Sequence, residues 1–160
     1  MASRYSGPLT VYRIADSRHP LFDGRGAALI GGRWNSPGSP VIYCGATFAG
    51  CMLEQLAHAA IGILPASQRW ASATIPRGVR IEEIGTADLP GWDSADLMES
   101  RAFGDVWLTG RRTVALVVPS IVGRPVERNV VLNPKHDDFK RIEVSKSSSV
   151  IWEPRLRARR

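Results

Sequence analysis

The sequence contains no long hydrophobic segment. No run in the 160 residues approaches the roughly 18 consecutive apolar residues that a membrane-spanning helix requires. The N-terminal residues MASRYSGPLT also lack the apolar centre of a secretory signal. We therefore expect no membrane contact and take the cytoplasm as the default location. Because 44% of the residues are hydrophobic, we expect one domain over residues 1–154, followed by a short basic tail at 155–160.

Cysteine and histidine are too few and too scattered to suggest a metal site. Cys44 and Cys51 are the two cysteines, and the three histidines stand apart, with no CxxC or HExxH pattern. Zinc sites need several such ligands at short spacing. We expect no bound metal, and we interpret both cysteines as buried thiols.

Positive charge is in excess, but most of it lies at the C-terminus. The formal net charge is +6, and removing the four charges of Arg155, Arg157, Arg159 and Arg160 leaves +2 for the first 154 residues. A nearly balanced body does not predict a basic nucleic-acid groove, so we expect no direct DNA binding. The tail is typical of a solvated terminus. A second interpretation stays open, in which the chain is a non-enzymatic module that binds RNA or a partner protein through these arginines.

The common nucleotide-binding and hydrolase motifs are also missing. No GxxxxGK[ST] loop and no GxSxG turn occurs, and the string GRGAAL at residues 24–29 lacks the third glycine of a dinucleotide fingerprint. The glycine-rich stretch around this string, residues 22–40, is long for a small domain and holds apolar anchors such as Trp34. We interpret it as an ordered binding loop without regular structure.

Runs of β-branched and aromatic residues predict more strands than helices. We expect strands at 9–15, 40–45, 69–75, 79–85, 113–120, 129–134, 139–145 and 149–154. We expect one helix at 48–63, capped by Thr47, and another at 95–108, capped by Asp93 or Ser94 and closed by Gly110. Because the helices do not alternate regularly with strands, the pattern predicts a single α+β domain with a central, mostly antiparallel strand core and a few helices.

The helix expected at 48–63 has two different faces. Helical periodicity defines a core stripe of five residues: Phe48, Met52, Leu56, Ala59 and Ile63. Glu54 projects nearly opposite, on a flank with Gly50, Ala57 and Ile61, and no cation lies three or four residues away. A solvated face more often carries paired charges. We therefore expect another segment or a ligand to approach Glu54 closely.

Five polar residues stand at the edges of apolar elements: Arg13, Arg33, Tyr43, Glu54 and Ser120. Taken one at a time, each has an ordinary interpretation. The arginines could brace carboxylates, Tyr43 could belong to the core, Glu54 could be solvated, and Ser120 could be a turn residue.

Taken together, these residues fall within six short strings in a fixed order. The strings are YR at 12–13, GGRWN at 31–35, VIYCG at 41–45, MLEQL at 52–56, PS at 119–120 and NVVLNPKHDDF at 129–139. Through them, over residues 9–145, the chain resembles the RES-domain family, whose members are toxins of RES–Xre toxin–antitoxin pairs. Asp137 follows His136 where the family often has proline, and the basic tail lies outside the resemblance.

The resemblance implies an NAD-consuming domain similar to the ADP-ribosyltransferase toxins, with NAD as substrate and no metal required. Matched by motif, the expected catalytic residues are Glu54, Arg33 and Ser120. The expected NAD-binding residues are Arg13, Arg33, Tyr43 and Asn133. The resemblance also implies a cognate antitoxin with an Xre-like helix-turn-helix, which we expect to cover the NAD cleft.

These residue types suit cleavage of the nicotinamide–ribose bond. Arginine forks match phosphate oxygens, and a tyrosine ring can stack on the cationic pyridinium. A carboxylate such as Glu54 can bind the ribose 2′-hydroxyl and stabilise the positive charge that develops as the bond breaks. We expect transfer of ADP-ribose to an acceptor, favour a cellular protein as that acceptor (mono-ADP-ribosylation), and expect growth arrest. The alternative is a phosphorylase or glycohydrolase that depletes NAD with phosphate or water as the acceptor.

Overall fold

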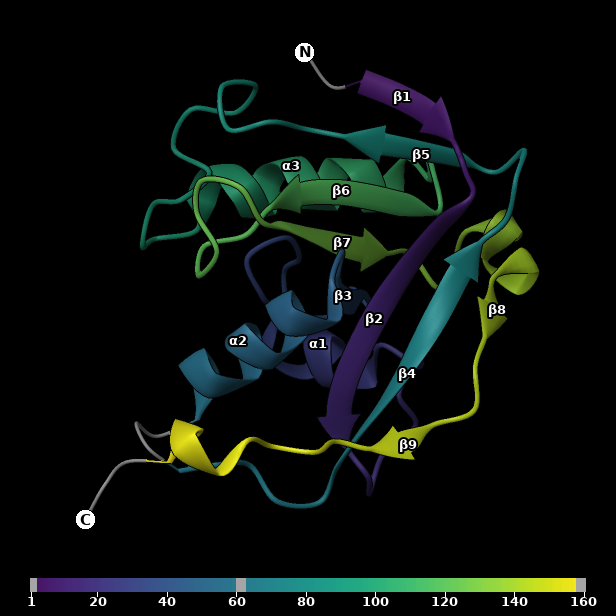
Figure 1. Cartoon of the computed structure of the whole chain (residues 1–160). Coiled ribbons are helices and arrows are strands. Elements are labelled where there is room, and N and C mark those ends of the chain that lie inside the picture. The colour runs from purple at the N-terminus through teal and green to yellow at the C-terminus, as the bar shows by residue number, and fades with distance from the viewer. Residues whose placement is uncertain (1–2, 60–62, 158–160) are drawn as a thin grey trace.

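One β-sheet forms the centre of the fold. The structure, a computed structural model, describes residues 3–59 and 63–157. Within these ranges nine strands join in one sheet, and three α-helices accompany it (Figure 1). This arrangement confirms the predicted α+β class.

The strands are β1 (Ser3–Ser6), β2 (Leu9–Asp16), β3 (Ile42–Gly45), β4 (Gln68–Ile75), β5 (Arg80–Glu83), β6 (Ala115–Pro119), β7 (Arg128–Leu132), β8 (Glu143–Val144) and β9 (Ser148–Ser149). The α-helices are α1 (Arg25–Ile30), α2 (Phe48–His58) and α3 (Met98–Thr109), and two short 3₁₀-helices are η1 (Asp137–Arg141) and η2 (Pro154–Leu156).

The sheet encloses a core between its two halves. Its strand order is β1-β5-β6-β7-β3-β2-β4-β8, with β9 beside β4, and every described pair is antiparallel except β5 with β6. In Figure 1, β2 and β4 run across the direction of β6 and β7. Val11 of β2 and Ile75 of β4 share one buried cluster with Ile81 of β5 and Val130 of β7. The two halves of the sheet therefore pack on a common apolar interior.

A second core lies between the sheet and α3. Along β6, Ala115 and Val117 belong to the first cluster, whereas Leu116 and Val118 belong to the second. This alternation follows from the two-residue period of a strand. Trp107 of α3 fills the second cluster without any exposed surface, and its indole Nε1 donates to Thr113 Oγ1 at 2.9 Å. Figure 1 accordingly places α3 alongside β6.

The sheet splits between β2 and β3. These neighbours form a single residue pair, Tyr12 with Gly45. Side chains satisfy backbone groups where the ladder is interrupted. The Cys51 thiol donates to Tyr12 O at 2.8 Å and accepts from Gly45 N at 3.2 Å, and Gln55 Nε2 donates to Ile14 O at 3.3 Å. Because Cys51 and Gln55 both belong to α2, this helix seals the split.

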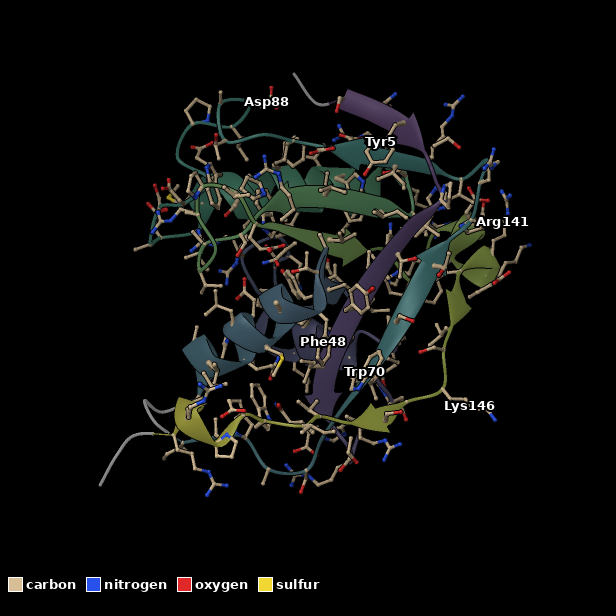
Figure 2. All side chains as sticks on the ribbon, viewed as in Figure 1. Tyr5, Phe48, Trp70, Asp88, Arg141 and Lys146 are labelled. Carbon is tan, nitrogen blue, oxygen red and sulfur yellow. The ribbon has the colours of Figure 1, made fainter. Side chains whose placement is uncertain are left out.

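Helix α2 is fixed at its N-terminal end. The Thr47 hydroxyl accepts from Gly50 N at 2.9 Å, which confirms the predicted cap. The Phe48 ring lies 5.0 Å from the Trp70 ring of β4, centroid to centroid; Figure 2 labels both residues. The Phe48 ring also lies 6.2 Å from that of Tyr12. Aromatic pairs at such separations contribute about 0.5–1.5 kcal/mol beyond their buried area. The cap and these rings orient α2 against β2 and β4.

The predicted core stripe of α2 was only partly right. Its buried residues are Gly50 and Cys51, whereas Phe48, Met52 and Leu56 of the expected core stripe are only half-buried. Cys51 is buried because it lies at the split in the sheet, whereas Gly50 is buried against Glu127. A Cβ on Gly50 would lie 3.0 Å from the carboxylate carbon of Glu127. The helix also ends at His58 rather than residue 63, because Ala59 adopts an extended conformation. Ile63, the last residue of that stripe, is 61% exposed, and residues 60–62 of the expected helix lie outside the described residues.

The predicted second helix exists, but its cap was wrong. Helix α3 ends at Gly110 as predicted and begins after Leu97, whose φ is 62°, with no side-chain cap. The two residues expected as caps have other partners. The carboxylate of Asp93 pairs with Arg124 at 3.0 Å, and the carbonyl of Ser94 accepts from Arg33 at 3.0 Å.

The remaining strand predictions divide between the middle and the end of the chain. The strands expected at 9–15, 40–45, 69–75, 79–85, 113–120 and 129–134 are confirmed with shifted ends as β2 to β7. The strands expected at 139–145 and 149–154 were mostly wrong: η1 occupies residues 139–141 of the first segment, residues 150–153 of the second have no regular structure, and β8 and β9 are two residues each. The ring of His136 caps η1 by accepting from Asp138 N at 3.0 Å, which turns the chain there. The loop expected at 22–40 contains a short helix, α1, that ends at Gly31.

Candidate active site

A cavity of about 580 Å³ opens where β2 and β3 separate. Its volume falls in the range of roughly 300–1,000 Å³ that is typical of small-molecule sites. Six of its lining residues carry the polar groups discussed below: Arg13, Arg33, Tyr43, Glu54, His58 and Asn129. They come from β2, the segment after α1, β3, α2 and β7, so the cavity gathers parts of the chain that are distant in sequence.

Glu54 is held by two donors on one oxygen. Its Oε1 accepts from Asn129 Nδ2 at 2.6 Å and from the Ser120 hydroxyl at 3.1 Å. Ser120 is 1% exposed and is itself fixed, because its Oγ accepts from Gly123 N at 3.1 Å. No hydrogen bond within the described residues goes to Oε2 of Glu54. The carboxylate is therefore oriented by one oxygen while the other stays available to a ligand.

Arg33 lines the cavity from the segment that follows α1. Its Nη1 donates to Trp92 O at 2.8 Å and to Ser94 O at 3.0 Å, which leaves Nε and Nη2 without such partners in the described part of the chain. Partial burial lowers the pKa of Arg33 from its ordinary value, but a guanidinium stays protonated at neutral pH. The cavity therefore has a fixed positive charge with unused donors.

Arg13 contributes a second cation to the lining of the cavity. It lies one residue past the single β2–β3 pair, where its Nη1 donates to Tyr43 O at 2.7 Å and its Nε donates to Leu21 O. These bonds take the place of the ladder bonds that the split removes. Nη2 of Arg13 has no partner in the described residues, so each of the two arginines that line the cavity keeps an unused donor.

Tyr43 and the GGRWN segment lock each other in place. The Tyr43 hydroxyl donates to Asn35 Oδ1 at 2.7 Å and accepts from Trp34 N at 2.9 Å. Burial raises the pKa of Tyr43 to about 12, so this hydroxyl stays protonated. A Cβ on Gly32 would lie 2.5 Å from the same hydroxyl oxygen, which explains why glycine precedes Arg33. Asn35 is fully buried, and it both orients Tyr43 through Oδ1 and braces the loop, because its Nδ2 donates to the carbonyls of Ala27 and Ser39 at 2.9 Å each.

The cysteines form part of the cavity wall. Both are free and buried, which confirms the interpretation as buried thiols. Burial raises the pKa of Cys44 to about 12 and that of Cys51 to about 11, so neither is a thiolate at neutral pH. Within the described residues no group of three or more histidine, cysteine, aspartate or glutamate side chains is placed to hold a metal ion.

The sequence-predicted site residues mostly meet in this cavity. Arg13, Arg33, Tyr43 and Glu54 line it, and Ser120 contacts Glu54 from behind. Asn133 does not line it. That side chain is buried beyond the end of β7, where Nδ2 donates to Leu108 O at 3.3 Å.

The sequence reasoning missed Asn129, which contacts Glu54 directly. It opens the same NVVLNP string that contains Asn133. The register of β7 beside β3, with Asn129 opposite Gly45, brings it to the cavity. The sequence also predicted that another segment approaches the flank of Glu54 closely. Gly50 on this flank lies against Glu127, which agrees with that prediction. Ala57 is exposed, and Ile61 lies outside the described residues.

The comparison with known proteins decides the family. Residues 10–153 match the RES domain. The chain belongs to the RES domain family. The resemblance inferred from the six strings is therefore confirmed. No helix among the described residues combines the length and the apolar character that crossing a bilayer demands.

Two relatives in the RES family carry names that describe a toxin. "Prs ADP-ribosylating toxin" of Sphingobium sp. (strain YBL2) is 35% identical over 137 residues, which cover 83% of this chain and 84% of the relative. "Toxin Res" of Photorhabdus laumondii subsp. laumondii is 33% identical over 138 residues, which cover 82% and 85%. A chain of the crystallised M. tuberculosis MbcT–MbcA toxin–antitoxin complex superposes with a TM-score of 0.74 at 20% identity, over 96% of this chain and 88% of that one. This last likeness concerns the fold.

Proposed function

We propose that this RES-domain protein is the toxin of a toxin–antitoxin pair and that it cleaves the nicotinamide–ribose bond of NAD. The observation that carries the proposal is the arrangement of Glu54, whose Oε1 is held by Ser120 and Asn129 in a cavity that also contains Arg13 and Arg33. The names of the two relatives, one of them an ADP-ribosylating toxin, support the same reaction.

The two arginines bind the pyrophosphate of NAD. Each guanidinium is held by backbone carbonyls and retains unused N–H donors. Binding of the anion therefore costs little further side-chain conformational entropy. Tyr43, whose hydroxyl is engaged with Asn35, presents its ring to the cavity and stacks on the cationic nicotinamide. The buried Asn133 has no direct part in this binding.

Glu54 stabilises the reacting sugar. Oε2 accepts a hydrogen bond from the ribose 2′-hydroxyl, and the negative charge of the carboxylate favours the oxocarbenium character that develops as nicotinamide leaves. Preorganised groups of this kind change rates by about 10²–10³ each. Ser120 and Asn129 act by holding the carboxylate, so the charge need not reorient during the reaction.

The ADP-ribosyl group then passes to an acceptor, for which we favour a nucleophilic side chain of a cellular protein. The loss of NAD or the modification of that protein arrests growth. An antitoxin with an Xre-like helix-turn-helix binds the toxin and covers the cavity. The toxin–antitoxin complex of the structural neighbour supports the existence of such a partner.

The test uses the purified chain, NAD labelled in its adenylate phosphate, and cell lysate, with and without inorganic phosphate. A labelled protein band indicates transfer to protein, ADP-ribose phosphate indicates phosphorolysis, and free ADP-ribose indicates hydrolysis. Released nicotinamide measures the bond cleavage that all three outcomes share. Glu54→Gln keeps the size of the side chain but removes its charge, so nicotinamide release should fall at least about 10²-fold.

The matched control is Glu143→Gln, which changes an exposed glutamate of β8 and should leave the rate unchanged. If Glu54→Gln released nicotinamide as fast as the wild type, the proposed function would be wrong.

A further inference from the structure

His58 lies at the end of α2, one helical turn after Glu54, and lines the same cavity. None of the roles assigned above uses it. Its side chain is exposed, so a molecule that enters the cavity from solvent can reach the ring.

The tautomer of His58 is fixed by a backbone contact. Its Nδ1 lies 2.7 Å from the carbonyl oxygen of Glu54. A carbonyl oxygen only accepts, so Nδ1 carries the hydrogen and, in the neutral ring, Nε2 carries the free lone pair. The ring is thereby held with its basic nitrogen away from the helix.

The proposed reaction needs a group of this kind. The acceptor of ADP-ribose carries a hydroxyl or amine proton that must leave as the new bond forms, and Glu54 is engaged with the ribose. The other titratable residues that line the cavity do not serve. Arg13 and Arg33 carry guanidinium groups, which donate hydrogen bonds and accept none, and burial raises the pKa of Tyr43, Cys44 and Cys51 to between about 11 and about 12. Among the described residues that line the cavity, His58 is the remaining group that can accept this proton.

We propose that His58 is the general base that activates the acceptor, an inference that rests on the proposed function. The C1′–N bond of NAD breaks, and nicotinamide leaves with its electron pair. The acceptor oxygen or nitrogen bonds to C1′, and its proton passes to Nε2 of His58. Residues four apart on a helix stand about 5–6 Å apart at Cβ. A ribose carbon beside Glu54 is therefore within reach of an acceptor that contacts His58.

The test compares two small acceptors, water and azide. Water must lose a proton when it attacks C1′, whereas the azide anion carries none. For His58→Ala, nicotinamide release in azide-free buffer should fall about 10²–10⁴-fold, the usual contribution of general base catalysis. Added azide should restore the rate to near that of the wild type under the same conditions, with ADP-ribosyl azide as the product identified by mass spectrometry.

Two further variants make the result decisive. His58→Gln can still donate to the Glu54 carbonyl but has no basic nitrogen, so it should behave like His58→Ala and serves as the test if the alanine variant fails to fold. His19→Ala changes an exposed histidine in the turn after β2 and should react like the wild type with both acceptors.

Each contrary outcome points to a different failure. An equal loss with water and azide would assign His58 a merely structural role as the partner of the Glu54 carbonyl, and an unchanged rate with water would assign it none; both overturn the proposal. Wild-type protein that releases no nicotinamide in buffer or lysate would overturn the proposed function and this inference together. Normal NAD cleavage that depends on Glu54 but not on His58 would overturn this inference alone.

Discussion

Replacing Asn129 by alanine tests whether the orientation of Glu54 limits the reaction. The change removes the 2.6 Å hydrogen bond to Glu54 Oε1 and leaves the 3.1 Å bond from Ser120. A hydrogen bond to a charged group contributes about 1.5–3 kcal/mol. Since about 1.4 kcal/mol corresponds to a factor of ten, kcat/KM for nicotinamide release should fall about 10–150-fold.

The loss should appear mainly in kcat, because the two arginines that bind the pyrophosphate are untouched. The assay is the initial rate of nicotinamide release over a range of NAD concentrations, with circular dichroism to establish folding. The matched control is Thr10→Ala, which removes an exposed hydroxyl of β2 bonded at 3.4 Å to Thr74 Oγ1 and should leave both constants unchanged. A folded Asn129→Ala protein with a rate within about twofold of the wild type would refute the view that this amide orients the carboxylate.

Two further predictions concern the packing around the cavity. Gly32→Ala places a Cβ 2.5 Å from the Tyr43 hydroxyl oxygen, so urea unfolding should show a loss of about 1–3 kcal/mol. Gly26→Ala, where the added Cβ meets nothing within 4 Å, should show no such loss, and equal stabilities of the two variants would contradict the packing argument. The free energy of unfolding should also fall as the pH rises above about 8.5, because the thiols ionise there in the unfolded chain, whereas in the folded chain burial raises the pKa of Cys51 to about 11 and that of Cys44 to about 12. The unfolded chain then binds fewer protons than the folded one. Urea titrations at pH 8, 9 and 10 measure the decline, which should be shallower when both cysteines are alanine; identical slopes would show that the thiols do not cause it.

The strands could be predicted where the residue types of the segment itself determine its conformation. The apolar run from Ala115 to Pro119 and the alternating run from Leu9 to Asp16 form strands because their residue types favour a pleated, buried backbone whatever lies beside them. The run FKRIEVS has similar composition at 139–145, yet most of it is a 3₁₀ turn or a two-residue strand at the edge of the sheet. A ring nitrogen of His136, three residues earlier, caps that turn, and such a side-chain contact outweighs propensity over so short a segment.

The helix face and the complete site were not predictable, because both depend on neighbours that are distant in sequence. Periodicity identifies the apolar side of α2, but the split between β2 and β3 decides that Cys51 approaches the sheet, and the chain before β7 decides that Gly50 packs against Glu127. The motifs pointed to Glu54, but the asparagine that binds it depends on the register of β3 and β7. The alternative in the same string, Asn133, stands four residues further, about 13 Å along an extended chain.

The split that α2 closes between β2 and β3 bears on which mutations would inactivate the protein under the proposed function. Cys51 and Gln55 replace missing ladder bonds and belong to the same helix as Glu54. A mutation at either position would remove contacts that close the split and would loosen the helix that carries the carboxylate. Among cells that survive induced expression, inactivating mutations should therefore occur at Cys51 and Gln55 as well as at the residues proposed for catalysis. The positions of such mutations would report on the closure of the split as well as on the chemistry.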